Sequence, residues 1–154
     1  IQVFSRTGHV FFKKAMRREN ALYGGEISAH HYFRDFFYCD SGMIPWLIVL
    51  EIVSNSKLNM SEMCSKDKNN FPSSEEINFL VAKPQACIEK LRNFYSDASE
   101  IDYTDGLSVS YDSWRFNIRI SNTENVLRLN VETKAMHSLL NEKINEISTI
   151  VKNI

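Results

Sequence analysis

The sequence predicts a chain of two parts, an incomplete α/β domain followed by a small α+β domain that has an antiparallel sheet and two helices. Hydrophobic residues make up 44% of the 154 residues, which is enough to bury a core. A polar stretch that contains a proline, residues 66–76, separates the chain into two halves. Helical periodicity dominates before this stretch, whereas apolar and polar residues alternate after it. We therefore predict a first domain at 1–65, a linker at 66–76 and a second domain at 77–154.

The first half is predicted to contain short strands and three helices. The expected strands are 1–5 and 21–23, and the expected helices are 10–20, 44–56 and 61–66. Gly24 and Gly25 are expected to form a turn in which the backbone takes positive φ. Asp40 or Ser41 can cap the second helix. Because that helix is apolar on nearly all sides, we expect it to lie in a core.

The second half is predicted to be strand, helix, three antiparallel strands and helix. The expected ranges are 76–82, 84–95, 107–111, 113–121 and 125–133, followed by a helix whose apolar stripe runs from Met136 to Val151. Pro84 suits the first turn of a helix. Asp105-Gly106 is a typical turn between two β-forming runs. This order of elements predicts a compact α+β unit.

Charge, cysteine content and hydropathy exclude several classes of function. The formal net charge of -1 argues against a nucleic-acid partner, which usually requires a basic excess. The three cysteines form no C-x-x-C pair, so we expect neither a disulfide scaffold nor a cysteine zinc site, and a cytoplasmic location fits best. The longest apolar run, 43–50, is too short for a membrane span and contains Pro45. Because the sequence opens on Ile1 and not on Met, we expect that it lacks its natural N-terminus.

A carboxylate, a hydroxyl and an imidazole follow the two glycines. In an extended segment the side chains of Glu26, Ser28 and His30 would point the same way. Together they would offer donors and acceptors to a polyhydroxylated ligand. Three other interpretations stay open. They are a metal site that combines Glu26 with His30 and His31, a Ser-His-Glu triad, for which the G-x-S-x-G turn is missing, and an ordinary polar surface loop.

A second candidate site joins the last two predicted strands, in the run R-I-S-N-T-E-N at 119–125. A guanidinium, hydroxyls and turn amides are the groups that bind a phosphate. The candidate residues are Arg119, Ser121, Asn122 and Thr123. The same residues would also suit an ordinary hairpin loop. His9, in the run T-G-H, is a weaker third candidate, because a lone histidine is more often structural.

These runs resemble motifs of the bacterial phosphomannomutases of the α-D-phosphohexomutase superfamily. The stretch G-G-E-I-S-A-H resembles their sugar-binding motif G-E-M-S-[GA]-H, with Ile27 in place of the usual Met. The run at 119–125 resembles their phosphate-binding loop R-x-S-N-T-E-P, with Asn125 in place of Pro and Ile120 bulkier than the common residue. The run R-T-G-H also resembles a family segment whose histidine lies near the active site. The resemblance covers nearly the whole chain and implies the end of a third domain, with an incomplete sheet, and a complete fourth domain.

The resemblance also implies roles for the candidate residues. Glu26 and Ser28 would bind adjacent sugar hydroxyls, and His9 and His30 would lie near the sugar or its phosphate. The phosphate that is not transferred would be held by Arg119, Ser121, Asn122 and Thr123. Asn122 favours a phosphomannomutase over a phosphoglucosamine mutase, which tends to have Gly there. Both Asn125 and Ile120 could shift the phosphate loop.

The family interconverts hexose 6-phosphate and hexose 1-phosphate through a hexose 1,6-bisphosphate intermediate. It uses a phosphorylated serine in T-A-S-H-N-P and Mg²⁺ bound by D-G-D-x-D-R, and this chain contains neither motif. We expect the chain to bind a hexose phosphate, to be inactive by itself, and to have the missing N-terminal domains as partners. The whole enzyme would supply mannose 1-phosphate for GDP-mannose and surface polysaccharide. The alternatives are a non-catalytic sugar-phosphate binding module, a relic that binds nothing, and phosphoglucomutase-type specificity.

Overall fold

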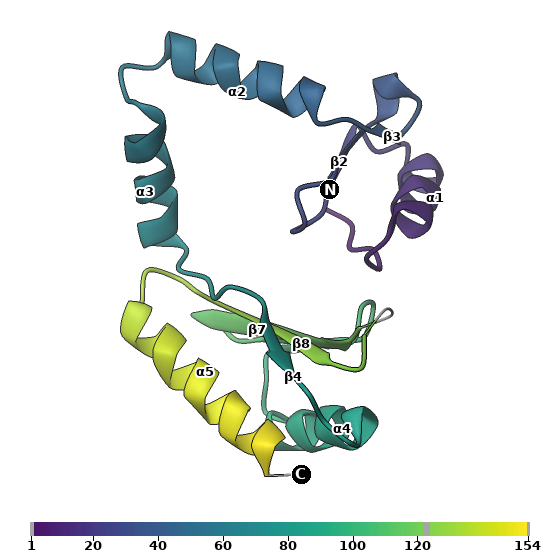
Figure 1. Ribbon diagram of the computed structural model, residues 1–154, viewed down its shortest axis with the longest axis vertical. Helices are drawn as coiled ribbons and strands as arrows, with labels where there is room; N and C mark the ends of the chain where they lie inside the picture. Colours follow the sequence, from purple (N-terminus) through teal and green to yellow (C-terminus); the bar gives the residue numbers. More distant parts are fainter. Residues whose placement is uncertain (1, 122–123, 154) are drawn as a thin grey trace. The chain divides into compact units, whose positions relative to one another are not determined.

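The computed structural model describes residues 2–121 and 124–153, and the chain divides into two compact units at 1–63 and 64–154 (Figure 1). Asn122 and Thr123, two of the predicted phosphate-binding residues, lie outside the described residues. The mixture of helices and antiparallel sheets agrees with the predicted fold class. No helix within residues 2–121 and 124–153 has the length and apolar character that crossing a membrane requires.

The first unit consists of a small sheet, helices and loops. Its elements are α1 (His9–Glu19), β1 (Tyr23–Gly25), β2 (His31–Phe33), the short 3₁₀ helix η1 (Arg34–Phe36), β3 (Cys39–Asp40), α2 (Met43–Asn55) and the first turn of α3 (Met60–Asn70). The three strands pair antiparallel in the order β1-β2-β3. Phe12 of α1 stacks on Tyr32 of β2 at 5.3 Å, and Met16 of α1 is buried. Helix α1 therefore packs against the sheet through the apolar face that its periodicity predicts.

Gly24 and Gly25 do not form the predicted turn. Both lie in β1, and neither has positive φ. Close packing explains the glycines instead. A Cβ atom on Gly24 would lie 2.9 Å from the Met16 sulfur, and one on Gly25 would lie 2.7 Å from the Tyr23 hydroxyl. A side chain at either position would force Met16 or Tyr23 to shift, although the backbone itself is ordinary extended strand.

The strand predicted at 1–5 is absent from the described residues, because residues 2–5 pair with none of the three strands of the first sheet. An apolar, β-forming sequence becomes a strand only when a neighbour accepts and donates its backbone hydrogen bonds. The strand predicted at 21–23 is confirmed with a shift of two residues, since it begins at Tyr23.

Helix α2 begins as predicted but does not lie in a core. The Ser41 hydroxyl accepts a hydrogen bond from the Ile44 N–H at 3.3 Å, and Pro45 occupies the first turn. None of the residues of α2 is buried, and the exposed fractions of Trp46 and Leu47 are 53% and 56%. The prediction of a core helix was wrong for this chain, because the first unit supplies no second layer against this apolar surface.

Helix α3 extends five residues into the predicted linker. The Asn59 carboxamide oxygen accepts from the Glu62 N–H at 3.0 Å, while the Glu62 carboxylate accepts from the Asn59 N–H at 2.8 Å. This reciprocal pair is a capping box, which satisfies two donors at the start of a helix. The polar composition of residues 66–70 indicated a loop, but they continue the helix that the capping box begins.

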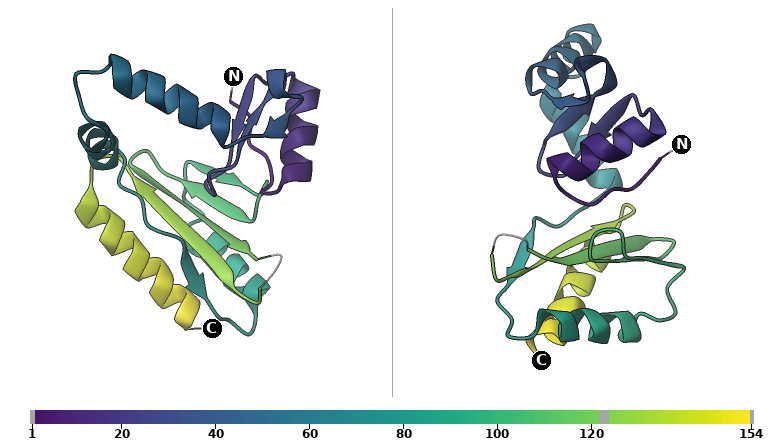
Figure 2. Two further views of the ribbon diagram at one scale, coloured as in Figure 1. Left: turned by 45° about the horizontal axis from the view of Figure 1, so that its top comes forward. Right: turned by 90° about the vertical axis from the view of Figure 1, so that its right-hand side faces the viewer.

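The second unit is a five-stranded antiparallel sheet covered on one face by two helices (Figure 2). Its elements after α3 are β4 (Ile77–Phe79), α4 (Pro84–Phe94), β5 (Glu100–Asp102), β6 (Leu107–Ser110), β7 (Trp114–Ile120), β8 (Leu127–Thr133) and α5 (His137–Lys152). The strand order is β4-β8-β7-β6-β5. The short strand β5 was not predicted, since it has only three residues at the edge of the sheet.

Alternation along β7 creates two different faces. Trp114, Phe116 and Ile118 are buried in the core beneath α4 and α5. Ile120 continues this alternation but is 41% exposed, because it is the last residue of the strand. The alternate residues, among them Asn117 and Arg119, lie on the opposite face, which α4 and α5 leave uncovered. This uncovered face carries the second candidate site.

Candidate functional site

The first candidate site is a tight hairpin turn between β1 and β2. The Glu26 N–H donates to the His30 carbonyl at 2.9 Å, and the Ala29 N–H donates to the Glu26 carbonyl at 3.0 Å. Ala29 has φ 63°, so the left-handed residue of this turn is an alanine and not one of the glycines. The prediction that Glu26, Ser28 and His30 alternate along an extended segment was therefore wrong. The turn gathers them in another way, because Glu26 and His30 close it and Ser28 lies within it.

The Glu26 carboxylate is held by two hydroxyl groups. The Tyr32 hydroxyl donates to Oε1 at 2.7 Å, and the Ser28 hydroxyl donates to Oε2 at 3.3 Å. Tyr32 is completely buried. Its burial raises the pKa of the phenol, and the hydrogen bond to Glu26 raises it further. The phenol therefore remains a hydrogen-bond donor to Glu26 throughout the neutral range.

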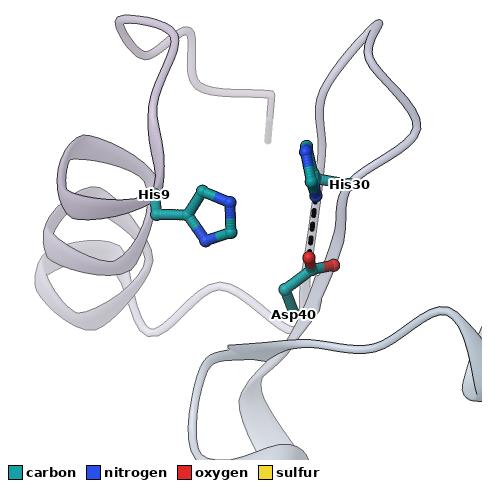
Figure 3. Close-up of side chains that lie close together, drawn as sticks. All are labelled: His9, His30 and Asp40. Atoms are coloured by element: carbon teal, nitrogen blue, oxygen red, sulfur yellow. Dashed lines mark hydrogen bonds and ion pairs between the residues drawn. The ribbon is translucent and has the colours of Figure 1, made fainter.

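His30 forms a pair with Asp40, and His9 lies beside it (Figure 3). Nδ1 of His30 and Oδ2 of Asp40 are 2.7 Å apart, and Oδ1 of Asp40 accepts the His31 N–H at 3.0 Å. The hydrogen bond from His30 lowers the pKa of the Asp40 carboxyl, although partial burial opposes the shift. The His9 ring meets the His30 ring edge to face at 4.8 Å and the Tyr32 ring at 5.3 Å. The site thus combines an anionic carboxylate with two imidazoles.

The three groups could in principle hold a metal ion, since one ligand atom from each of His9, His30 and Asp40 lies within 4.8 Å of the others. Two nitrogens and one carboxylate suit a transition metal such as Zn²⁺. Mg²⁺ takes oxygen ligands, so this donor set does not fit it. His30 and Asp40 are already hydrogen bonded, and an ion bound by both at those atoms would have to break that bond. The metal site that was considered with Glu26, His30 and His31 does not form among the described residues, because the ligand atoms that lie together are those of His9, His30 and Asp40.

The arrangement does not form the Ser-His-Glu triad that was left open. A triad needs its base within hydrogen-bond reach of the nucleophile and oriented by the carboxylate. Here the carboxylate partner of His30 is Asp40, and the Ser28 hydroxyl donates to Glu26. Asp40 had been considered only as a helix cap. It follows His30 by ten residues, so only the pairing of β2 with β3 brings the two side chains together.

The second candidate site is the hairpin between β7 and β8. The Ser121 N–H donates to the Val126 carbonyl at 2.9 Å, which closes the loop. The Ser121 hydroxyl accepts the Glu124 N–H at 3.2 Å. Ser121 is buried, and Arg119 immediately precedes Ile120 at the end of β7. The structure thus brings Arg119 and Ser121 to one end of the uncovered sheet face.

Carboxylates surround the Arg119 guanidinium. Its Nη2 lies 3.5 Å from Glu76 and its Nε lies 3.9 Å from Asp105. Arg128 is directly opposite Arg119 in the antiparallel register. Arg128 contacts the other Glu76 oxygen at 3.0 Å and Glu124 at 2.7 Å. Two guanidinium groups therefore share one carboxylate beside the loop. A phosphate that binds Arg119 would replace the contacts of this guanidinium with Glu76 and Asp105, which are weak and partly solvated.

Sequence reasoning missed three of these charged residues, namely Glu76, Arg128 and Asp105, the last of which was considered only as a turn residue. The predicted strand ends, Ser121 and Asn125, would have paired Arg119 with Leu127, which is one residue away from its observed partner Arg128. Glu76 lies far away in sequence, and no sequence pattern indicated that it would contact Arg119.

Gly106 has φ 77°, and a Cβ atom there would contact the Ile118 carbonyl oxygen and lie 2.6 Å from the Arg119 Cβ. The predicted turn at Asp105-Gly106 is confirmed, and its glycine allows the chain to pass close to Arg119.

Comparison with known proteins identifies the family. Residues 2–71 match the family model described as phosphoglucomutase/phosphomannomutase, alpha/beta/alpha domain III, and residues 76–148 match the C-terminal domain of the same family. A crystal structure of a phosphoglucomutase/phosphomannomutase family protein from Burkholderia thailandensis superposes with a TM-score of 0.76 at 28% sequence identity. That similarity covers 97% of this chain and 32% of the other.

Named relatives are more similar in sequence. A protein named "Phosphohexose mutases" from Xanthomonas campestris pv. campestris (strain B100) is 50% identical over 153 residues, which are 99% of this chain and 34% of the relative. A "Phosphomannomutase" from Vibrio cholerae serotype O1 is 46% identical over 156 residues, which cover 100% and 34%. A "Phosphomannomutase" from Escherichia coli is 50% identical over 151 residues, which cover 97% and 33%. The chain spans about a third of the length of these curated relatives. The two family models together match most of the chain, which therefore belongs to the phosphoglucomutase/phosphomannomutase family.

Proposed function

We propose that this chain is the sugar- and phosphate-recognition portion of a phosphomannomutase that interconverts mannose 6-phosphate and mannose 1-phosphate. The observation that carries the proposal is the hairpin turn, which holds Glu26, Ser28 and His30 together with defined hydrogen-bond partners. The relatives from Vibrio cholerae and Escherichia coli are named phosphomannomutases, which supports mannose as the sugar.

In this proposal the hairpin turn of the first unit recognises the sugar. Glu26 accepts hydrogen bonds from sugar hydroxyls, and Ser28 donates to or accepts from the adjacent hydroxyl. His30 and His9 contact the sugar or its phosphate. A carboxylate whose two oxygens are already fixed by Tyr32 and Ser28 discriminates well, since a sugar of the wrong shape leaves its remaining acceptor sites unpaired.

The hairpin loop of the second unit holds the phosphate that is not transferred. Arg119 supplies a guanidinium whose fork geometry matches a phosphate. Ser121, with Asn122 and Thr123, supplies the remaining donors of the loop. The carboxylates of Glu76 and Asp105 lie beside Arg119 and orient its guanidinium before the phosphate arrives.

The proposal assigns phosphoryl transfer to parts of the enzyme that this sequence does not contain. The motifs S-H-N-P and D-G-D-x-D-R are absent from the 154 residues. In-line phosphoryl transfer needs a positioned donor and cations that stabilise the developing charge. We therefore propose that the chain alone is inactive. In the whole enzyme Mg²⁺ would stabilise that charge, and the hexose 1,6-bisphosphate intermediate would reorient within the active site. The product would serve GDP-mannose and surface polysaccharide synthesis.

Calorimetry with mannose 1-phosphate tests the recognition role. We expect the chain to bind it and the Arg119→Ala variant to bind at least ~10-fold more weakly, because a charge-assisted hydrogen bond is worth about 1.5–3 kcal/mol. Arg115→Ala is the matched control, since Arg115 lies on the same strand and face but pairs with Glu132 at 3.8 Å. Equal affinity of the Arg119 variant and the wild type would contradict the assigned phosphate site, and no binding by the wild type would favour a relic.

A mutase assay tests the proposed inactivity. The chain alone is incubated with mannose 6-phosphate, Mg²⁺ and a hexose 1,6-bisphosphate primer, and mannose 1-phosphate is measured. We expect no turnover, and robust turnover would contradict the proposed inactivity of the chain. Binding of glucose 1-phosphate at the same affinity as mannose 1-phosphate would favour phosphoglucomutase-type specificity.

A further inference from the structure

We infer that Tyr32 and Asp40 are positioning residues beneath the hairpin turn, and that each fixes one recognising side chain: Tyr32 fixes Glu26, and Asp40 fixes His30. This inference rests on the proposed function, because it concerns how the proposed sugar site is held in shape. Neither residue was a candidate from the sequence, and neither is proposed to touch the sugar.

The two residues form a cross-strand pair in the sheet. Tyr32 of β2 and Asp40 of β3 are directly opposite each other in the antiparallel register. Residues paired in this way present their side chains on the same face of a sheet. Both therefore reach the turn from the same side, where Glu26 and His30 close it. One pair of neighbouring strands thus supports both ends of the turn.

The Tyr32 hydroxyl has little freedom to move. Its ring is 0% exposed, stacks on Phe12 with an interplanar angle of 19° and meets the edge of His9. The packed ring defines where the hydroxyl lies, and the hydroxyl is 2.7 Å from Glu26 Oε1. A glutamate that is held in one rotamer before binding loses less side-chain entropy when the sugar binds.

Asp40 determines which nitrogen of His30 carries the proton. The carboxylate is fixed at Oδ1 by the His31 N–H, and Oδ2 lies 2.7 Å from His30 Nδ1. A carboxylate only accepts hydrogen bonds, so Nδ1 must carry a hydrogen and Nε2 of the neutral ring keeps its lone pair. Nε2 can therefore accept a hydroxyl proton, and it donates to a phosphate when the ring is protonated.

Two isosteric variants separate positioning from packing. Tyr32→Phe removes the hydroxyl and keeps the stacked ring. Asp40→Asn keeps an oxygen for the His31 N–H but offers His30 an amide donor in place of an acceptor. The matched controls are Tyr23→Phe, which removes a hydroxyl that pairs with His31, and Asp35→Asn, which changes an exposed carboxylate that pairs with Arg34. Each control makes the same chemical change in the same unit, at a side chain whose partner is His31 or Arg34 and not Glu26 or His30.

NMR of the 154-residue chain gives a readout that does not depend on catalysis. In the wild type the ¹⁵N shifts of His30 should show the Nδ1–H tautomer, and Asp40→Asn should convert the neutral ring to the Nε2–H tautomer. Tyr32→Phe should lower the side-chain order parameter of Glu26 and leave the His30 tautomer unchanged. Retention of the Nδ1–H tautomer in Asp40→Asn, or of Glu26 order in Tyr32→Phe, would overturn the corresponding assignment.

Calorimetry with mannose 1-phosphate then links positioning to recognition. We expect affinity to fall about 5-fold in Tyr32→Phe and about 10-fold in Asp40→Asn, with both controls within about 2-fold of the wild type. Unchanged affinity in both test variants would overturn the inference. If the wild type binds no sugar phosphate, the proposed function fails, but the tautomer and order parameter still decide whether Tyr32 and Asp40 hold these side chains.

Discussion

The two units differ in how much of their own core they contain. In the second unit, α4, α5 and the strands β4, β6, β7 and β8 contribute to a continuous buried cluster that includes Leu91, Phe116 and Ile147. Within the described part of the first unit, the buried apolar side chains are only Met16 and Tyr32, while α2 exposes most of its apolar residues. The second unit can support the hairpin loop between β7 and β8 by itself. The first unit places the hairpin turn between β1 and β2 on a thin layer, and it supplies no cover for the apolar surface of α2.

The largest effect is expected from a cavity in the second unit. Phe116→Ala should lower the free energy of unfolding of this unit by about 3–5 kcal/mol, because it removes a fully buried ring from a closely packed core. Urea denaturation followed by the fluorescence of nearby Trp114 measures the change. Leu80→Ala is the control in the same unit, since Leu80 is 84% exposed and its loss should cost less than about 0.5 kcal/mol. Similar costs for both variants would break the distinction between core and surface.

A smaller steric effect is expected in the first unit. Gly24→Ala should destabilise it by about 1–3 kcal/mol, since the new Cβ would lie 2.9 Å from the Met16 sulfur where α1 packs on the sheet. Gly42→Ala is the matched control, because a Cβ there meets nothing within 4 Å. Amide hydrogen exchange of β1 and β2 should accelerate in the first variant alone. Equal protection in the two variants would show that this packing contributes little.

The exposed surface of α2 should cause self-association. Replacing Leu47 and Leu50 with lysine adds two charges to an apolar helix and should weaken association by about 10-fold or more, which sedimentation velocity measures at several concentrations. Ser54→Lys with Asn55→Lys adds the same charge at the polar end of α2 and should have less effect. A monomeric wild type would show that the apolar surface is tolerated without a cover.

The smallest effect concerns the acid stability of the second unit. Burial alone would raise the pKa of Glu146, but hydrogen bonds from the Tyr95 hydroxyl and the Lys143 ammonium lower it below its ordinary value. A lowered folded-state pKa contributes stability above the unfolded-state value, and that contribution is lost as the pH falls through the folded-state pKa. Glu146→Gln should therefore cost about 1 kcal/mol at pH 7 and less at pH 3. Urea denaturation at both pH values checks this, and a constant cost would contradict it.

The outcome of the predictions follows the same division between the units. In the second unit, alternation and helical periodicity predicted the strands β6, β7 and β8 and both helices. These patterns succeeded because each element buries one face against its neighbours in the unit. In the first unit, the strand at 1–5 and the core position of α2 were wrong. Both depend on neighbours that the described residues do not provide.

For the sites, the sequence by itself determined which chemical groups are present: Glu26, Ser28 and His30 close together, Arg119 and Ser121 beside a turn, and a resemblance strong enough to predict the family. Only the tertiary structure decided the partners. Asp40 reaches His30 across β2 and β3, and Glu76 reaches both Arg119 and Arg128. The physical reason is that motifs and periodicity are local along the chain, whereas hydrogen bonds and ion pairs at these sites depend on strand register and packing between distant segments.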